Sequence, residues 1–220
     1  MRTLHAAIVL LLGILLAVPA SAQAARDWRA AIRQTPAGAY VIGNPKAPVK
    51  LVEYLSYTCP HCGKFVAESK GELFDDLVRR GRVSVEVRHA VRDGLDLTAA
   101  LLVRCTGPAN FLASHGAVFA GQESMLTRAQ SFQPAAGTSQ GAQLVALADA
   151  SGVSALLRPR LNTAPAACLS ASADRQKLVA MAEDAFRKIQ GTPSFEIDGA
   201  PAQGNDWAAI KPQLLAAGAR

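Results

Sequence analysis

Two cysteines separated by two residues are the strongest chemical signal in this 220-residue chain. They form Cys59-Pro60-His61-Cys62, directly after an apolar run over residues 49–57 that predicts a buried strand. Pro60 suits the first turn of a helix, where its missing N–H would have no partner. We therefore expect Cys59 at the helix N-cap, where the first-turn amides and the helix dipole favour a thiolate. Cys62, one turn further in, is expected to be the protected partner of a redox-active pair.

Half of a zinc site is the alternative interpretation of two cysteines at this spacing. Structural zinc usually takes four ligands, so a second cysteine or histidine pair should follow. None does, because the other cysteines, Cys105 and Cys168, are isolated in the sequence. We therefore expect neither a metal nor a cofactor, and the chemistry to rest on the two sulfurs of Cys59 and Cys62.

Glu53 is the exception in the apolar run. A carboxylate is costly to bury, and this one precedes Cys59 by six residues. If its strand is covered on both faces, Glu53 could lie beneath the cysteine pair and exchange protons with Cys62. The alternative is a position at the edge that points to solvent.

The N-terminus has the pattern of a targeting segment. Arg2 supplies a positive start, residues 6–18 are apolar, and Ala20-Ser21-Ala22 is a small-x-small cleavage site. We expect residues 1–22 to be a signal peptide, with cleavage after Ala24 as the other option and an uncleaved anchor as the alternative. Export would place the mature protein in an oxidising compartment, the periplasm.

Composition and charge limit the functional classes. Half of the residues are hydrophobic and only 5% are aromatic, which predicts one domain with a core rich in Ala, Leu and Val. The formal net charge is +6, but the basic residues are scattered along the chain. Because no run of five or more like charges occurs, we expect a solvated surface and no nucleic-acid partner.

The first part of the chain predicts a strand–helix–strand unit, with two parallel strands and a right-handed crossover. Gly81 is expected to end the helix. The predicted elements are a short helix over residues 27–34, a strand over 39–42, the strand over 49–56, a helix over 60–80 and an alternating strand over 82–91.

The rest of the chain changes in character twice. Residues 97–169 contain no strand pattern and predict several helices, interrupted by a loop over residues 122–141 that is rich in Gln, Ser, Thr and Gly. His115 lies at helical spacing among apolar residues, which indicates a structural histidine. A long helix follows over residues 174–190, with Phe186 among its inward residues. A hairpin with an Asp198-Gly199 turn and a last helix complete the chain.

Taken together, the Cys59–Cys62 motif after a strand and Thr192-Pro193 before a late hairpin resemble the DsbA family of exported thiol:disulfide oxidoreductases. The resemblance covers the whole mature chain. It implies an α/β, thioredoxin-like fold: a central mixed sheet flanked by helices, with an inserted all-helical subdomain. Residues 35–96 would form the first thioredoxin half, 97–169 the insertion and 170–220 the second half.

The resemblance also assigns roles to residues. It implies that Thr192-Pro193 is a cis peptide folded against the cysteine pair, which leaves the amide and carbonyl of Thr192 to pair with an extended substrate. Glu53 matches the family's buried acid. Two departures stand out. Many DsbA proteins carry Val before the proline, whereas Thr occurs in isomerase and reductase relatives. The second departure is the additional pair of cysteines, Cys105 and Cys168.

Cys105 and Cys168 bracket the helical block. In an exported protein two remaining cysteines are expected to pair, and the alternative is two buried thiols. Such a bridge resembles a second, non-catalytic disulfide that only some DsbA-like members contain.

The function implied is a thiol oxidase that introduces disulfides into reduced, unfolded exported proteins through Cys59 and Cys62, with His61 stabilising the Cys59 thiolate. Family likeness implies a quinone-linked membrane thiol oxidase of the DsbB type as reoxidant. A reductase or isomerase is the first alternative. It is disfavoured because residues 25–34 are too short for a dimerisation domain, so we expect a monomer. A redox-independent, chaperone-like binding module is the second alternative.

Overall fold

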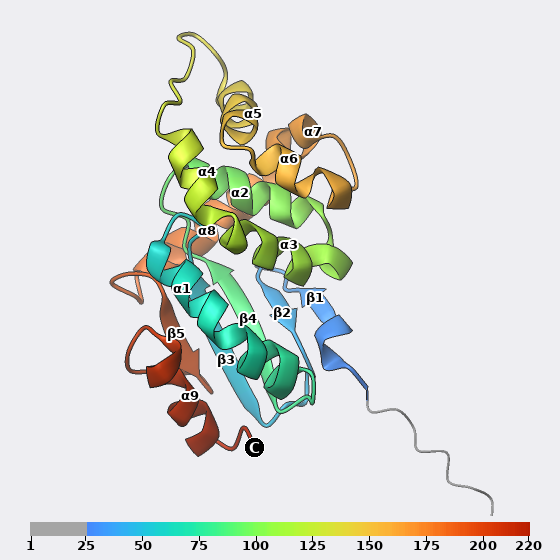
Figure 1. The fold of residues 1–220 in the computed structure, drawn as a ribbon, viewed down its shortest axis with the longest axis vertical. Helices are drawn as coiled ribbons and strands as arrows, with labels where there is room; N and C mark the ends of the chain where they lie inside the picture. The colour runs from blue at the N-terminus through green and yellow to red at the C-terminus, as the bar shows by residue number, and fades with distance from the viewer. Residues whose placement is uncertain (1–25) are drawn as a thin grey trace, which may run out of the picture.

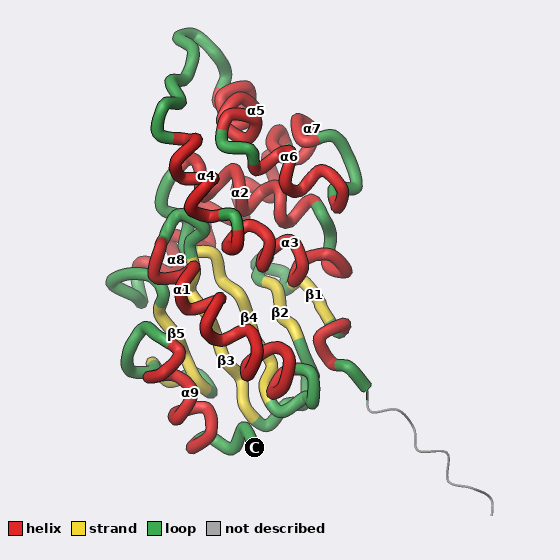
Figure 2. The backbone as a smooth tube through the Cα atoms, viewed as in Figure 1, coloured by secondary structure: helices red, strands yellow, loops and turns green. Residues whose placement is uncertain are grey.

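The computed structural model describes residues 26–220, and the predicted signal peptide, residues 1–22, lies outside the described residues with both cleavage sites. A six-stranded mixed sheet forms the centre, in the order β1-β2-β4-β3-β5-β6 (Figures 1 and 2). The strands are β1 (Ile32–Gln34), β2 (Tyr40–Ile42), β3 (Val49–Leu55), β4 (Val83–His89), β5 (Ser194–Ile197) and β6 (Ala200–Pro201).

The strand β3 is the centre of this sheet and ends next to the cysteine motif. It pairs in parallel with β4, from Val49 opposite Val83 to Leu55 opposite His89, and antiparallel with β5. The parallel pair confirms the predicted strand–helix–strand unit. A parallel connection needs a crossover of a dozen residues or more, and the helix that begins at Pro60 provides it.

Helices cover both faces of the sheet. On one face lie α1 (Pro60–Ser69), a π-helical segment (Lys70–Val78) and α9 (Trp207–Ala216). Phe65 of α1 packs there against Phe195 and Trp207, with ring centroids 4.4 and 6.1 Å away. On the opposite face, α8 (Ser172–Phe186) packs Ala185 against side chains of β3. The α/β, thioredoxin-like architecture is therefore confirmed.

A block of helices between β4 and α8 sits at one end of the sheet (Figure 1). Its helices are α2 (Gly94–Cys105), α3 (Pro108–Ala120), α4 (Gln122–Ala129), α5 (Gln140–Ala150), α6 (Val153–Leu157) and α7 (Pro165–Ser170). Within residues 26–220, no helix is both long and apolar enough to span a membrane.

Two predicted elements are wrong because tertiary pairing overrides local pattern. Residues 27–34 do not form a helix: a single 3₁₀ turn (Trp28–Ala30) is followed by β1, which forms a hairpin with β2. Residues 122–141 are not all loop, because α4 occupies the first eight. Gln122 and Met125 of α4 are buried, so contacts with the rest of the fold stabilise a helix that its polar composition obscures.

Helix ends also differ from the prediction. The helix that begins at Pro60 changes at Lys70 to π-type bonding, as in the Arg79 N–H to Phe74 carbonyl bond of 3.2 Å. It ends before Gly81 as predicted, where φ is +76°. The helix α8 stops at Phe186, whose side chain is 44% exposed instead of inward.

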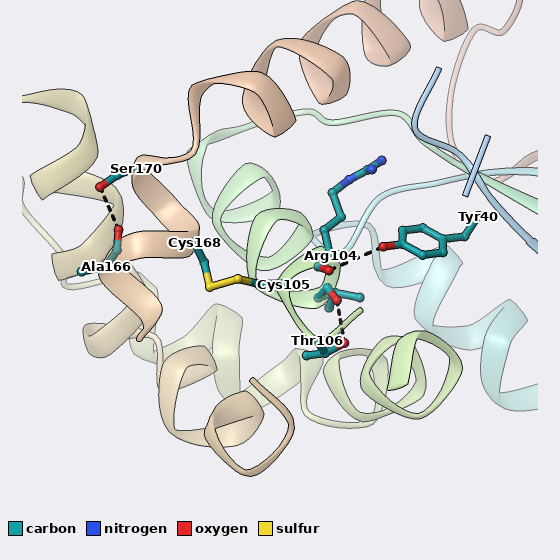
Figure 3. The surroundings of a disulfide bond; sticks show 8 residues. Tyr40, Arg104, Cys105, Thr106, Ala166, Cys168 and Ser170 are labelled. Carbon is teal, nitrogen blue, oxygen red and sulfur yellow. Dashed lines mark hydrogen bonds between the residues drawn. A yellow bond between two sulfur atoms is a disulfide. The ribbon is translucent and has the colours of Figure 1, made fainter. Parts of the chain in front are cut away.

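Cys105 and Cys168 form a disulfide bond that joins the end of α2 to α7, with their Cα atoms 5.8 Å apart (Figure 3). It closes a loop of 63 residues. A crosslink over such a loop reduces the conformational entropy of the unfolded chain, worth about 4 kcal/mol.

Replacing both Cys105 and Cys168 with serine is therefore expected to lower the free energy of unfolding by about 4 kcal/mol. Urea unfolding of the double variant and the wild type measures the difference. The double substitution is preferable to a reductant, which would also act on Cys59 and Cys62. A loss below about 1 kcal/mol would contradict the entropic account.

Candidate active site

The cysteine motif forms the junction between β3 and α1, as predicted. Cys59 is the N-cap residue with an extended backbone, and Pro60 occupies the first turn. The N–H groups of Cys62 and Gly63 donate to the Cys59 carbonyl at 3.0 and 3.2 Å. The first turn of α1 is thus closed on Cys59, whose sulfur lies at the positive end of the helix.

The two thiols are free and differ strongly in environment. Hydrogen bonds from the Cys62 thiol, the Thr192 side chain and the backbone amides of Cys62 and His61 lower the pKa of Cys59 to about 4. Burial, followed by the hydrogen bond to Cys59, raises the pKa of the fully buried Cys62 thiol. One sulfur is therefore a thiolate at neutral pH, and the other holds its proton.

The Thr192-Pro193 peptide is cis and lies against the cysteine pair. Cys59 Sγ is 3.1 Å from the Thr192 carbonyl oxygen, which accepts a hydrogen bond from this sulfur while the thiol is protonated. This contact joins residues 133 positions apart. The two segments that carry the family resemblance therefore meet at the sulfur of Cys59.

A surface hollow of about 400 Å³ lies beside Cys59. Cys59 itself is only 3% exposed, and it lines this hollow. The side chain of His61 is exposed. The residues that line the hollow with Cys59 are Pro60, His61, Arg92, Phe186, Gln190, Gly191 and Thr192.

Glu53 is fully buried in β3, so the edge position is excluded. Successive side chains of a strand point to opposite faces. Because Leu51 and Leu55 pack in the core cluster that contains Cys62, Glu53 projects toward the same face. Neither carboxylate oxygen has a hydrogen-bond partner among the described residues. Burial raises the pKa of Glu53 to about 8.

Two aspartates that sequence reasoning missed hold the loop before Cys59. The Tyr57 N–H donates to Asp96 at 2.8 Å, and the Thr58 hydroxyl donates to Asp93 at 2.6 Å. Asp93 is also the N-cap of α2 and accepts from the Asp96 N–H. The Asp-x-x-Asp spacing before an apolar helix was a readable capping signal; the contact with the cysteine loop had no local signal.

His115 is a core residue, consistent with the structural interpretation. Its Nδ1 lies 2.9 Å from the Tyr57 hydroxyl, and its ring packs against Phe111 and Phe119. Burial lowers the pKa of His115 to about 3, so the ring is neutral. Within residues 26–220, no group of three or more His, Cys, Asp or Glu residues is placed to hold a metal ion.

Residues 35–214 match the family model described as thioredoxin. The chain belongs to the thioredoxin family. Among the solved structures of this fold, a protein-disulfide isomerase from Novosphingobium aromaticivorans is 35% identical. It superimposes with a TM-score of 0.73 over 80% of this chain and 95% of that one. The alignment therefore spans nearly all of that relative.

More distant thioredoxin-family structures share the fold alone. BdbD from Bacillus subtilis is 20% identical with a TM-score of 0.58, covering 80% of this chain and 91% of that one. Wolbachia pipientis α-DsbA1 is 21% identical with a TM-score of 0.54, covering 80% of this chain and 88% of that one. These alignments support the DsbA-like arrangement of sheet and helical block.

A curated relative from Rickettsia prowazekii, named as a candidate protein-disulfide oxidoreductase, is 34% identical over 84 residues. The match covers 38% of this chain and 31% of the relative. The chain thus spans about a third of the length of that relative.

Proposed function

We propose that this protein is a thiol:disulfide oxidoreductase that acts as a thiol oxidase, introducing disulfide bonds into reduced, unfolded proteins. The observation that carries the proposal is the unequal thiol pair at the start of α1. A thiolate stabilised at Cys59 makes the dithiol form favourable and the disulfide form reactive. The pKa of about 4 at Cys59, beside the raised pKa of Cys62, supports this direction of electron flow.

The proposed reaction starts from the Cys59–Cys62 disulfide. A substrate thiolate attacks Cys59 Sγ, the bond between the two enzyme sulfurs breaks, and Cys62 leaves as a thiolate. A second substrate thiolate then attacks the substrate sulfur of the mixed disulfide and releases Cys59 as a thiolate. The substrate loses two electrons and becomes a disulfide, and the enzyme gains them as a dithiol.

Glu53 is proposed as the proton donor to Cys62. A leaving thiolate in this buried position needs a proton, because burial raises the pKa of Cys62. With a pKa of about 8, the Glu53 carboxyl is protonated at neutral pH and projects toward the α1 face. When the Cys59–Cys62 disulfide forms again, the Cys62 thiol would return this proton to the Glu53 carboxylate.

The hollow beside Cys59 is proposed as the substrate site. An extended segment there could pair with the backbone of Thr192, because the carbonyl accepts from Cys59 Sγ only while that sulfur carries a proton. Phe186 offers an exposed apolar surface in the same hollow. These features support the proposal that the hollow accepts an extended segment of an unfolded chain.

The cellular setting is also a proposal. Residues 1–22 would direct the protein to the periplasm, where a quinone-linked membrane oxidase would restore the Cys59–Cys62 disulfide. The protein would act as a monomer. The exchange between the substrate and the Cys59–Cys62 pair needs no cofactor bound to this chain, because in that exchange the electrons pass between sulfur atoms.

An isomerase or reductase is the second candidate. Thr192 before the cis proline favours it, and so does the similarity to the protein-disulfide isomerase from Novosphingobium aromaticivorans. The candidates share the site: a reductase differs from an oxidase in the direction in which electrons flow, whereas an isomerase leaves the net redox state of its substrate unchanged.

Equilibration with glutathione distinguishes the oxidase from the reductase. The purified protein is incubated with a series of ratios of reduced to oxidised glutathione, and free thiols are trapped at each ratio. A reduction potential well above that of the glutathione couple is expected, because the dithiol form is stabilised. A potential near that of thioredoxin would overturn the oxidase proposal in favour of the reductase.

A further inference from the structure

The carbonyl groups on both sides of Cys59 are held by one side chain of the helical block. Gln122, the first residue of α4, is only 7% exposed. Its Nε2 donates to the Tyr57 carbonyl at 2.8 Å and to the Cys59 carbonyl at 3.0 Å. The two partners lie more than 60 positions earlier in the chain.

This pair of bonds uses the full capacity of the amide nitrogen. A glutamine Nε2 carries two hydrogens, and both acceptors here are carbonyl oxygens. Only the nitrogen end of the amide can face two carbonyl groups, so the orientation of the Gln122 side chain is determined by its partners. A carboxylate or a thioether in its place would have no hydrogen to donate.

The position of these carbonyls links Gln122 to the reactive sulfur. The Tyr57 carbonyl belongs to the peptide before Thr58, and the Cys59 carbonyl belongs to the peptide after Cys59. Holding both peptide planes restricts the backbone torsions of the two residues between them. Those torsions set the direction of the Cys59 side chain relative to the amides of α1.

Gly63 makes room for this contact. A Cβ atom at that position would lie 2.5 Å from Gln122 Oε1, closer than real Cβ contacts allow, and 3.2 Å from its Cδ. The N–H of Gly63 also donates to the Cys59 carbonyl at 3.2 Å. The side chain of Gln122 and the first turn of α1 are therefore in direct contact, through a residue that has no side chain.

We propose that Gln122 is a positioning residue for Cys59, which keeps the sulfur aligned with the first-turn amides of α1. The inference rests on the proposed role of Cys59 as the reactive thiol. The helical block would then contribute to the redox site as well as to the packing at the end of the sheet, because Gln122 of α4 holds the backbone beside Cys59.

The structure also indicates that the contact can be removed without unfolding the loop. The Tyr57 N–H donates to Asp96, and the Thr58 hydroxyl donates to Asp93, both independently of Gln122. A variant at Gln122 therefore keeps two anchors of the same loop on α2.

The first test replaces Gln122 with Met, which preserves the length of the side chain and removes both donors. Thiolate absorbance at 240 nm is followed across a pH series. We expect the pKa of Cys59 to rise by about 1 unit, a tenfold loss of thiolate stabilisation, with a matching shift toward the disulfide in the glutathione equilibrium. The Gln143→Met variant is the control, because Gln143 bonds to the Thr138 carbonyl in the same block.

The second test uses Gly63→Ala, which retains Gln122 but displaces its amide. The same direction of shift is expected. In the double variant Gly63→Ala with Gln122→Ala the shift should equal that of Gln122→Ala alone, because the truncated side chain no longer meets the added methyl group. The inference would be overturned by an unchanged Cys59 pKa in Gln122→Met. It would also be overturned if the pKa shift of the double variant equalled the sum of the shifts in Gly63→Ala and Gln122→Ala.

The two proposals fail in different ways. If Cys59 of the wild type does not titrate below neutral pH, the proposed function is wrong and the inference has no basis. If the wild type titrates as expected and Gln122→Met titrates with it, only the role of Gln122 is wrong. Thermal unfolding of each variant shows whether a shift accompanies a loss of folding.

Discussion

Replacing Cys59 with serine is expected to reduce disulfide formation in a reduced, unfolded substrate to the uncatalysed rate. The reaction needs a sulfur that can form and release a disulfide, and a hydroxyl cannot take that role. Cys59 is the only free thiol of the described chain with a lowered pKa, because the first-turn amides, the Cys62 thiol and Thr192 all contact it. Thiol trapping and the recovery of substrate activity measure the effect.

The matched control is Cys62→Ser, which retains the reactive sulfur and removes its partner. Incubated with a protein that already contains a disulfide, the Cys59 thiolate should attack it and remain joined to one substrate sulfur. With Cys62 absent, no enzyme thiol can resolve that mixed disulfide. Non-reducing electrophoresis should show the covalent adduct for Cys62→Ser and none for Cys59→Ser. Turnover that persists in Cys59→Ser would exclude the mechanism.

Glu53→Gln is expected to remove a large pH dependence of stability. Burial raises the pKa of Glu53 from 4.5 to about 8. The folded protein therefore keeps a proton that the unfolded chain releases between these values, so the stabilisation present below pH 4.5 is lost as pH rises through 8. Over the whole range the loss is at most about 5 kcal/mol. Glutamine occupies the same space without titrating.

The measurement is the free energy of unfolding by urea at several pH values between 4 and 9. The difference between Glu53→Gln and the wild type should grow in favour of the variant as pH rises. Glu183→Gln, on the exposed side of α8, should keep the wild-type profile because Glu53 is still present. If the free energy of unfolding changed with pH in the same way for Glu53→Gln and the wild type, the pKa of Glu53 would not be raised in the folded protein.

Glu53→Gln also separates stability from chemistry. If the carboxyl supplies the proton to the leaving Cys62 thiolate, the first exchange step should slow in the variant even where it is the more stable protein. If Glu53→Gln were more stable than the wild type at high pH but exchanged disulfides at the same rate, the raised pKa of Glu53 would be supported. The same result would exclude Glu53 as the proton donor to Cys62.

Local signals in the sequence were sufficient to locate the candidate site and to predict much of the fold. Pro60 has a ring that suits a first helical turn, and it follows an apolar strand. The N-cap position of Cys59 and the parallel β3–β4 pair therefore follow from residues within one supersecondary unit. The Asp198-Gly199 turn between β5 and β6 is of the same kind, since its backbone needs positive φ values.

Other features required the tertiary structure, because their partners lie far away in the chain. Residues 32–34 became a strand because β2 offered a hairpin partner. Gln122 lies in a polar segment that predicts a loop, and only the fold brings its amide to the carbonyl groups beside Cys59. A pattern of a few residues contains no information on a contact across 60 positions or more.

The sequence by itself determined the candidate groups of the site: two thiols at a helix start, a carboxyl in the preceding strand and a Thr-Pro pair near the end of the chain. The tertiary structure decided how they meet. It placed the Thr192 carbonyl 3.1 Å from Cys59 Sγ and buried Glu53 toward the face that carries Cys62. Residue type sets the intrinsic chemistry of a group, whereas its pKa depends on burial and on hydrogen bonds that only the folded chain supplies.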